Sequence, residues 1–418
     1  MSKKIVINTF GSLGDLFPYL AIALELKKRG HKPIIAANRT HQPFVEAQNI
    51  LFTHVQPEPL DFGSEQELVQ KIFSSKGLRY LVCEILMARL KEAYSDLEKV
   101  VVQADLLISH PFTFAAPLIA QKQEIPWIST ILSPISLLSA HDPPLFNPKL
   151  NLESFPVWLN RLIIAFLKNQ SRSWSQPLQA FRQELGLSPV KDPFFWGQRS
   201  PELNLSLFSS IFAPPQPDWG AFNHLTGFVF YEPYDAYLSE QLVKFLAQGS
   251  PPIIFTLGSS AIYHAGNFYR HAAKATQKLG ERAILLVGNN LENIPHELLS
   301  QNIITVDYAA HFLLFPHAKA IVHQGGIGTT AQAIKAGKPM LVVPFGQDQY
   351  DNANRVEQLH LGKMLTLVND ESIYLGLNEL LQYPAFQNQA QHIKEIITQE
   401  NGVKDACDQI EKFFTFSA

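Results

Sequence analysis

Short runs of aliphatic and β-branched residues alternate with helical patterns along this chain, and the alternation occurs twice. The runs with the composition of buried strands are Lys4–Thr9, Pro33–Ala37, Leu106–Ser109, Trp127–Ile131, Ile253–Leu257, Ala283–Val287, Ala320–His323 and Met340–Val343. Strands that alternate with helices are typical of βαβ units around a parallel sheet. The sequence therefore predicts an α/β fold with two facing Rossmann-like parallel-sheet domains and an inter-domain cleft between the carboxyl ends of their strands.

A proline-rich segment separates the two halves. Ala213–Gly220 contains three prolines within four positions and ends in glycine, a composition typical of a linker. We expect an N-terminal domain over 1–225, a C-terminal domain over 226–400, and a C-terminal helix over 401–418 that packs back towards the N-terminal domain. A length of 418 residues suits such an organisation.

Charge and cysteine content exclude several classes of protein. The chain has 34 Lys and Arg against 37 Asp and Glu, so no excess of positive charge is available for a nucleic-acid partner. Cys83 and Cys407 are too few for a disulfide framework. No apolar run reaches the ~18 residues of a membrane span, and the first apolar run, Ile5–Ile7, predicts a buried strand rather than a signal peptide. We expect a cytoplasmic protein.

One segment of the N-terminal half has a strong apolar helical face. Its members recur at helical spacing: Phe155, Trp158, Leu159, Leu162, Ile163, Phe166 and Leu167. We favour a helix that packs this face on its own domain. Two alternatives are left open, a lid over an apolar acceptor and a helix in peripheral contact with a membrane surface.

The strongest chemical signal is a glycine-rich turn between a strand and a helix, His323-Gln324-Gly325-Gly326-Ile327-Gly328-Thr329-Thr330. Glycines let a ligand approach the backbone, and the free N–H groups at a helix start attract phosphate. Thr329, Thr330 and His323 add side-chain donors. The alternative is a tight turn without a ligand. The segment is neither a Walker loop nor a G-x-G-x-x-G fingerprint.

Two further strand ends carry polar residues. Asp348 and Gln349 follow the strand Met340–Val343, where their side chains would hold sugar hydroxyls. We expect no metal there, because Asp348 and Asp351 have no third ligand nearby in the sequence.

The turn after the first strand, Gly11–Pro18, brings Asp15 to the tip of that strand. Asp15 is either the cap of a helix that begins near Pro18 and ends at Gly30, or a general base at the cleft. His110 lies at another strand tip, although a lone histidine is more often structural.

These motifs resemble the family 1 glycosyltransferases of the GT-B fold over nearly the whole chain. The similarity is greatest to the bacterial branch that includes rhamnolipid rhamnosyltransferase catalytic subunits, antibiotic glycosyltransferases and sterol glucosyltransferases. Gly11–Asp15 is similar to the G-S-x-G-D motif of that branch, and His323–Thr330 to its H-x-G-G-x-G-T-T donor motif. Asp348-Gln349 with Asn352 and Arg355 resembles its closing D-Q…N-x-x-R.

The resemblance implies an inverting transfer of a hexose from a nucleotide-sugar to a hydroxyl group, without metal or cofactor. Asp15 would be the catalytic base, and the acceptor would be a lipophilic molecule bound by the N-terminal domain. The donor-binding residues implied are Gly14, Ser259, Tyr308, His311, His323, Gly325, Gly326, Gly328, Thr329, Thr330, Asp348 and Gln349. The acceptor-binding residues expected are Phe17, His110, Phe112 and Phe114. Plant relatives have a glutamate for the ribose where this chain has Ala331, so uridine and thymidine are not separated, although we favour a UDP-hexose over a dTDP-deoxysugar.

Two rival functions use the same fold. A nucleotide-sugar epimerase would need additional acid and base carboxylates, for which the sequence offers no assignable set. A non-catalytic protein that binds a nucleotide-sugar would not need a base, so Asp15 argues against it. Dinucleotide oxidoreductases are disfavoured because the first strand is not followed by G-x-G-x-x-G.

Overall fold

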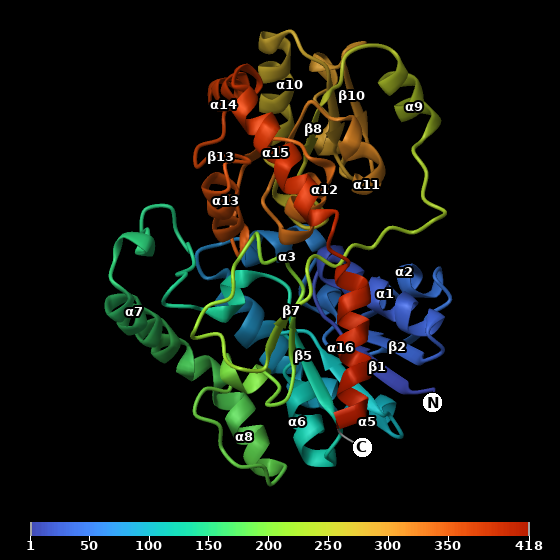
Figure 1. Ribbon diagram of the computed structural model, residues 1–418, viewed down its shortest axis with the longest axis vertical. Coiled ribbons are helices and arrows are strands. Elements are labelled where there is room, and N and C mark those ends of the chain that lie inside the picture. The colour runs from blue at the N-terminus through green and yellow to red at the C-terminus, as the bar shows by residue number, and fades with distance from the viewer. Residues whose placement is uncertain (1, 417–418) are drawn as a thin grey trace. The chain divides into compact units, whose positions relative to one another are not determined.

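The computed structural model describes residues 2–416 and divides them into two compact units (Figure 1). The first unit contains the residues up to Pro144, Asn151–Tyr231 and the segment from Asn401 onwards. The second unit contains Leu145–Leu150 and Glu232–Glu400. Each unit is built on one parallel sheet flanked by helices, as predicted.

The first unit has a seven-stranded parallel sheet in the order β3-β2-β1-β4-β5-β6-β7. Its strands are β1 (Lys4–Asn8), β2 (Lys32–Ala37), β3 (Leu51–His54), β4 (Leu106–Ser109), β5 (Trp127–Ile131), β6 (Asn204–Ser206) and β7 (Asn223–Leu225). Ile5 and Ile7 point to one face of β1 and Val6 to the other, so a separate buried cluster covers each face. The sequence missed the outer strands β3, β6 and β7.

The helices of the first unit are α1 (Leu13–Lys28), α2 (Gln42–Glu46), α3 (Glu65–Ile72), α4 (Gly77–Arg79), α5 (Leu90–Val101), α6 (Ala115–Gln123), α7 (Val157–Gln170), α8 (Gln176–Glu184) and α16 (Gly402–Phe416). Helix α1 begins five residues before the predicted start. The Ser12 hydroxyl accepts the Gly14 N–H, and the Ser12 N–H is bound by the Asp15 carboxylate, which makes a capping box with Asp15 at its third position. Pro18 therefore lies inside the helix.

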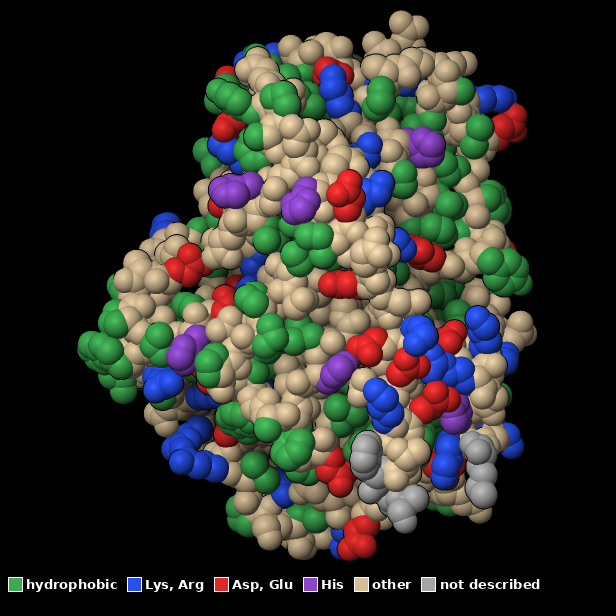
Figure 2. Space-filling view, viewed as in Figure 1, with side chains coloured by type: hydrophobic (Ala, Val, Ile, Leu, Met, Phe, Trp, Pro, Cys, Tyr) green, Lys and Arg blue, Asp and Glu red, His purple; other side chains and the backbone are tan. Residues whose placement is uncertain are grey.

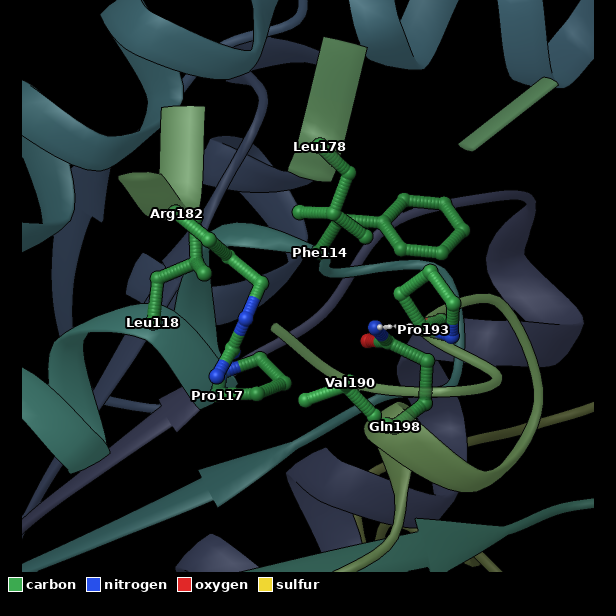
Figure 3. Close-up of a pocket in the computed structure, with 9 residues that line it drawn as sticks. Phe114, Pro117, Leu118, Leu178, Arg182, Val190, Pro193 and Gln198 are labelled. Carbon is green, nitrogen blue, oxygen red and sulfur yellow. Dashed lines mark hydrogen bonds between the residues drawn. The ribbon is translucent and has the colours of Figure 1, made fainter. Parts of the chain in front are cut away.

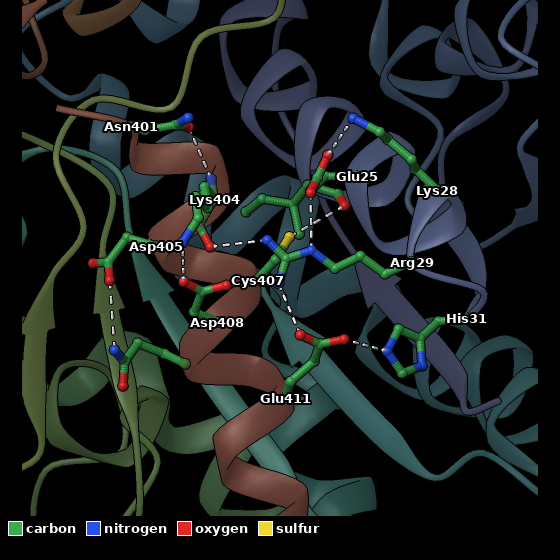
Figure 4. A network of polar contacts seen from close by, with 12 residues as sticks. Glu25, Lys28, Arg29, His31, Asn401, Lys404, Asp405, Cys407, Asp408 and Glu411 are labelled. Carbon is green, nitrogen blue, oxygen red and sulfur yellow. Dashed lines mark hydrogen bonds and ion pairs between the residues drawn. The ribbon is translucent and has the colours of Figure 1, made fainter. Parts of the chain in front are cut away.

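The chain's last helix, α16, packs along α1 in the same unit, and charged groups join the two (Figure 4). The Arg29 guanidinium bonds to Glu25 of its own helix and to Asp408 and Glu411 of α16, at 2.7 to 2.9 Å. His31 adds a contact of 3.1 Å to Glu411. The contact thus joins the end of the chain to its first helix.

The proline-rich segment Ala213–Gly220 does not separate the two sheets, so its prediction as the linker is wrong. It lies between β6 and β7 of one sheet. The Asp218 carboxylate accepts the Ser139 hydroxyl at 2.6 Å and the Ala140 N–H at 2.7 Å, and Trp219 is buried. These contacts fix the segment within the first unit.

The second unit has a six-stranded parallel sheet in the order β10-β9-β8-β11-β12-β13. Its strands are β8 (Ile253–Thr256), β9 (Ala283–Leu286), β10 (Ile303–Val306), β11 (Ala320–His323), β12 (Met340–Val342) and β13 (Gly362–Met364). Its helices are α9 (Glu240–Ala247), α10 (Phe268–Leu279), α11 (His311–Leu314), α12 (Ile327–Ala336), α13 (Gln349–Gln358), α14 (Asp370–Gln382) and α15 (Pro384–Ile397). Among the helices described in both units, none is long and apolar enough to cross a membrane.

Helix α7 confirms the predicted helix around 155–167, but its burial contradicts the favoured packing. Its buried side chains are Asn160 and Ile164. Trp158, Leu162 and Phe166 are exposed. The helix therefore turns the aromatic part of its apolar face outwards.

Candidate functional site

The first candidate site lies at the carboxyl ends of β1 and β4, which are neighbours in the first sheet. Asp15, one turn into α1, folds its carboxylate back over Gly11. The Asp15 Oδ2 atom accepts the Ser12 N–H at 2.7 Å and the Ser12 hydroxyl at 3.0 Å. Gly11 has φ +126°, and a Cβ atom there would meet Asp15 Oδ2 at 2.3 Å. The turn therefore requires glycine so that the carboxylate can take this position.

The other carboxylate oxygen of Asp15 faces His110. The distance from His110 Nε2 to Asp15 Oδ1 is 3.4 Å. His110 Nδ1 accepts the N–H of Phe112 at 3.1 Å, so in the neutral ring the proton sits on Nε2 and points at Asp15. His110 is thus a donor to the carboxylate, which the sequence did not foresee.

Asp15 and His110 differ in side-chain exposure, and the pKa of Asp15 is shifted. The Asp15 side chain is 34% exposed, whereas that of His110 is 4% exposed. Burial alone would raise the pKa of Asp15, but the bonds and charge of His110 and the bonds from Ser12 outweigh it and lower that pKa. Asp15 is therefore the ionised group of the pair that a substrate can reach.

Two buried side chains that sequence reasoning missed support this pair. His41 Nε2 lies 3.1 Å from the Gly11 carbonyl, which fixes the turn beneath Asp15. The Tyr19 ring packs edge-on against His110 with ring centroids 6.1 Å apart, and the Tyr19 hydroxyl bonds to Thr130. No local sequence motif marks either residue.

The predicted acceptor residues occupy different environments. Phe112 and Phe114 line a cavity of about 20 Å³ with Asn8, Thr9 and Phe10 at the strand ends. Phe114 is buried and also borders a second cavity of about 10 Å³, where it lies beside Leu178 and Pro193 (Figure 3). Phe17 lies outside both cavities and stacks on Tyr231 at 5.0 Å. Gly14 is exposed at the start of α1.

The second candidate site lies in the second unit, where β11 leads through the glycine turn into α12. His323 ends the strand and is fully buried. Its Nδ1 accepts the Gly325 N–H at 3.0 Å, so Nε2 carries the proton. Within residues 2–416, no hydrogen-bond partner reaches Nε2. Burial lowers the pKa of His323 to about 3, so the ring is a neutral donor rather than a positive charge.

The glycine turn itself is held by packing. Gly325 has φ +92°, and a Cβ there would meet the Gln349 carbonyl at 2.9 Å. Gly326 caps α12, and the Thr330 hydroxyl bonds back to the Gly326 carbonyl. Thr329 and Thr330 are both buried. Gly328 has open space where a Cβ would stand, so packing does not explain it.

The sequence did not predict a role for the Gln324 side chain in this site. A Cβ on Gly258 would meet Gln324 Nε2 at 2.3 Å, which places this amide against the turn that follows β8. Ser259, a predicted donor residue, is exposed on that turn. The proximity links the loops after β8 and β11, which are adjacent strands.

Asp348 and Gln349 stand at the start of α13, beside the glycine turn. Asn352 Nδ2 bonds to both the Gly325 carbonyl at 2.9 Å and Asp348 Oδ2 at 2.8 Å. Gln349 is buried, and its Oε1 accepts the N–H groups of Phe345 and Gly346. The bond from Asn352 thus holds Asp348 at the turn, while the Gln349 Oε1 atom is already bonded to backbone N–H groups of its own loop.

Tyr308 and His311 follow β10, at the far edge of this sheet from α13. Tyr308 is 70% exposed, so its ring face is open to a stacking ligand. His311 stacks on Phe315 at 4.3 Å, and burial lowers the pKa of His311 to about 4. No group of three or more His, Cys, Asp or Glu residues suited to a metal occurs in the described part of the chain.

Comparison with protein families agrees with this geometry. Residues 5–137 match the glycosyltransferase family 28 N-terminal domain, and residues 280–408 match the C-terminal domain of erythromycin biosynthesis protein CIII-like proteins. Together the two matches span more than half of the chain. The chain belongs to the glycosyltransferases of the GT-B fold. The predicted family and enzyme class are confirmed.

Two relatives illustrate the similarity of this glycosyltransferase to known proteins. It is 27% identical to O-mycaminosyltylonolide 6-deoxyallosyltransferase of Streptomyces fradiae, over 98% of this chain and 97% of the relative. It is 28% identical to sterol 3-beta-glucosyltransferase of Leptosphaeria maculans, over 97% of this chain but only 28% of that much longer relative.

Solved structures confirm the fold of this glycosyltransferase. The kitacinnamycin glycosyltransferase superposes with a TM-score of 0.76 at 17% identity, over 99% of both chains. The calicheamicin glycosyltransferase CalG4 gives 0.73 at 18% identity, over 99% of this chain and 98% of the other.

Proposed function

We propose that this glycosyltransferase moves a hexose from a nucleotide diphosphate sugar to a hydroxyl group of a lipophilic small molecule or natural product, with inversion and without a metal ion. A UDP-glucose-type donor is favoured, with a dTDP-deoxysugar as the second candidate. The observation that carries the proposal is the buried N–H of His323 Nε2, which has no partner in residues 2–416 and lies at the strand end that leads to the N-terminus of α12.

A leaving diphosphate matches that donor set. The first N–H groups of α12 have no carbonyl partner within the helix, and they attract anions. His323 adds a preorganised neutral donor that needs no protonation before it can donate. Donors fixed before the reaction stabilise the charge that develops as the bond between the anomeric carbon and the phosphate oxygen breaks. These hydrogen bonds would stabilise the charge of the leaving diphosphate, a role that a bound metal ion has in other enzymes.

The acceptor step falls to Asp15. Its carboxylate takes the proton of the acceptor hydroxyl while the hydroxyl oxygen forms its bond to the anomeric carbon and the diphosphate leaves with its electron pair. Attack opposite to the leaving group inverts the anomeric centre. His110 donates its Nε2–H to the carboxylate, which holds Oδ1 in place and keeps it ionised.

The relatives support the substrate classes. Those compared act, by their names, on a macrolide-type substrate and on sterols, and two of the structural neighbours are complexes with thymidine diphosphate. The cavity beside Phe112 and Phe114 has room for about one water molecule, so an acceptor would enter only if side chains around it moved.

Isothermal titration calorimetry with UDP and dTDP tests the donor assignment. We expect one of them to bind the wild-type protein and to bind His323→Ala more weakly, while the exposed His296→Ala serves as control. Equal affinity in both variants would contradict the phosphate site.

Product analysis by NMR, with UDP-glucose and a sterol or macrolide aglycone, tests the reaction. We expect a β-glucoside from the α-linked donor, with a rate that EDTA does not change. An α-glucoside would refute inversion, and a loss of rate in EDTA would refute metal independence. Conversion of the donor to an epimer without transfer, or binding without turnover, would favour the rival functions.

A further inference from the structure

Helix α7 exposes most of its large apolar side chains to solvent, which is the opposite of what a helix that covers a core does. Its inward side chains are Asn160 and Ile164, and Asn160 Nδ2 bonds to the Ala140 carbonyl at 3.2 Å. Its outward side chains include Trp158 at 62%, Leu162 at 59% and Phe166 at 59% exposure. A hydrogen-bonded asparagine thus fixes the rotation that leaves three large apolar side chains in solvent.

These three side chains form a continuous stripe, because residues four apart lie one above the other on a helix. Phe155 and Leu167 extend it and are themselves more than one third exposed. Single exposed apolar residues are ordinary, but a contiguous apolar stripe marks a surface that meets another apolar phase. We call Trp158, Leu162 and Phe166 the α7 stripe.

Basic side chains predominate around the stripe, although Lys168 of α7 pairs with Asp192 at 3.7 Å and Glu153 is exposed just before the helix. Arg161, next to Leu162, and Arg172, just beyond the helix, are exposed, and no Asp or Glu occurs from residue 154 to residue 183. Figure 2 shows hydrophobic side chains standing out over α7, with Lys and Arg side chains close to them. The chain as a whole is acidic by three charges, so this local balance is not a reflection of composition.

We propose that the α7 stripe docks the protein on the surface of an anionic phospholipid membrane. Trp and Phe side chains suit the boundary between headgroups and acyl chains, while arginines beside an apolar face bind acidic headgroups. The helix would lie in the plane of the surface, because its 14 residues are too short to span. A protein partner fits less well, because the exposed arginines beside the stripe, Arg161 and Arg172, complement a surface that carries negative charge throughout.

Vesicle co-sedimentation tests this proposal directly. We expect the full chain to bind vesicles of phosphatidylcholine with phosphatidylglycerol, and to bind vesicles of phosphatidylcholine alone much more weakly. Replacing Trp158, Leu162 and Phe166 together with serine should lower the partition coefficient by at least about tenfold, since each residue gives up large apolar burial. Replacing Arg161 and Arg172 with glutamine should lower it about fivefold per residue, from about 1 kcal/mol per basic residue near an anionic surface.

A matched control uses three apolar residues with similar exposure outside the stripe. Serine at Leu291, Leu367 and Tyr383 removes comparable apolar area, and it should leave vesicle binding unchanged. Retained melting temperature and nucleotide affinity in the stripe variant show that it is folded. Trp158→Phe should keep vesicle binding but lose the blue shift of tryptophan fluorescence that vesicles cause in the wild type.

Three outcomes would overturn the proposal. The first is wild-type protein that stays in the supernatant with anionic vesicles. The second is a stripe variant that sediments like the wild type. The third is a wild-type dimer in light scattering that the serine substitutions convert to a monomer, which would make the stripe an interface between two copies of the chain.

Discussion

Removal of the His323 imidazole should weaken nucleotide binding by a predictable amount. The buried Nε2–H has no partner among residues 2–416, so a bound diphosphate would supply its acceptor. A hydrogen bond to a charged group contributes about 1.5–3 kcal/mol, which corresponds to roughly 10- to 150-fold in Kd. We therefore expect His323→Ala to weaken the binding of UDP or dTDP, whichever binds, by this factor in calorimetry. His323→Gln, which retains an N–H donor, should recover part of it.

The same residue makes an independent prediction about stability and pH. The pKa of His323 falls from its ordinary 6.5 to about 3 on burial, so the unfolded chain binds a proton that the folded protein does not. Stability from this group is therefore present above pH 6.5 and is lost as pH falls towards 3. Between pH 7 and pH 5 the loss is about 2 kcal/mol. His323→Ala lacks this group, so its free energy of unfolding should change by about 2 kcal/mol less over that range.

Urea unfolding of both proteins at the two pH values measures this difference. The cost of the cavity left by alanine is present at both pH values and cancels. An equal change in both proteins would mean that folding leaves the pKa of His323 at its ordinary value, so that the folded protein takes up the same proton between pH 7 and pH 5. The argument for a neutral, preorganised donor would then fail, even if nucleotide affinity still fell.

Three further predictions concern the fold and the two sites. Asp15→Asn should lower kcat by about 10²–10⁴-fold and leave the nucleotide Kd unchanged, and a fully active variant would refute the role of Asp15 as the base. Ser12→Ala should lower the free energy of unfolding in urea by about 1 kcal/mol and keep most of the turnover. Gly325→Ala should lower the free energy of unfolding by about 1–3 kcal/mol, because Gly325 has a positive φ and lies close to the Gln349 carbonyl. Gly328→Ala should leave that free energy unchanged but weaken nucleotide binding, and an unaltered nucleotide affinity would remove Gly328 from the donor site. Arg29→Ala should lower the free energy of unfolding by about 2 kcal/mol, because three carboxylates each lose a charge-assisted bond, although Asp408 keeps Lys404 and Glu411 keeps His31. A value near zero would show that this guanidinium does not hold α16 in place.

The strands predicted well are those buried on both faces. β4 and β11 match the predicted bounds to the residue, because each begins with a continuous apolar run, Leu106–Ile108 or Ala320–Val322, and has its one polar residue at the end. The missed strands are short or lie at edges. β6 and β7 have three residues each and include asparagine or histidine, so neither shows a period. Their pairing depends on partners that are distant in the sequence.

The candidate sites were predicted in part for a similar reason. A strand-tip position was visible for Asp15, His110 and His323, because the carboxyl ends of parallel strands meet at one edge. The contact between His110 and Asp15 was not visible, since it depends on adjacent strands and on a glycine that lets a carboxylate fold back. The outward rotation of α7 was also hidden, because it depends on the bond from Asn160 to a distant carbonyl.

The two histidines at strand ends share one local structure, and this similarity bears on the donor site. His110 follows β4 and His323 ends β11, and in each case Nδ1 accepts the N–H of the residue two positions later, at 3.1 and 3.0 Å. Both rings therefore present a proton on Nε2. In the first unit that proton meets a carboxylate, Asp15. In the second it meets no acceptor in the described part of the chain, although a buried donor without one costs about 1–3 kcal/mol. This cost, at a fixed donor beside a helix N-terminus, supports the proposal that the second site binds an anion that arrives with the substrate. The proposed base site and the proposed leaving-group site thus each contain a histidine that presents a proton on Nε2, but only His110 has an acceptor for it among residues 2–416.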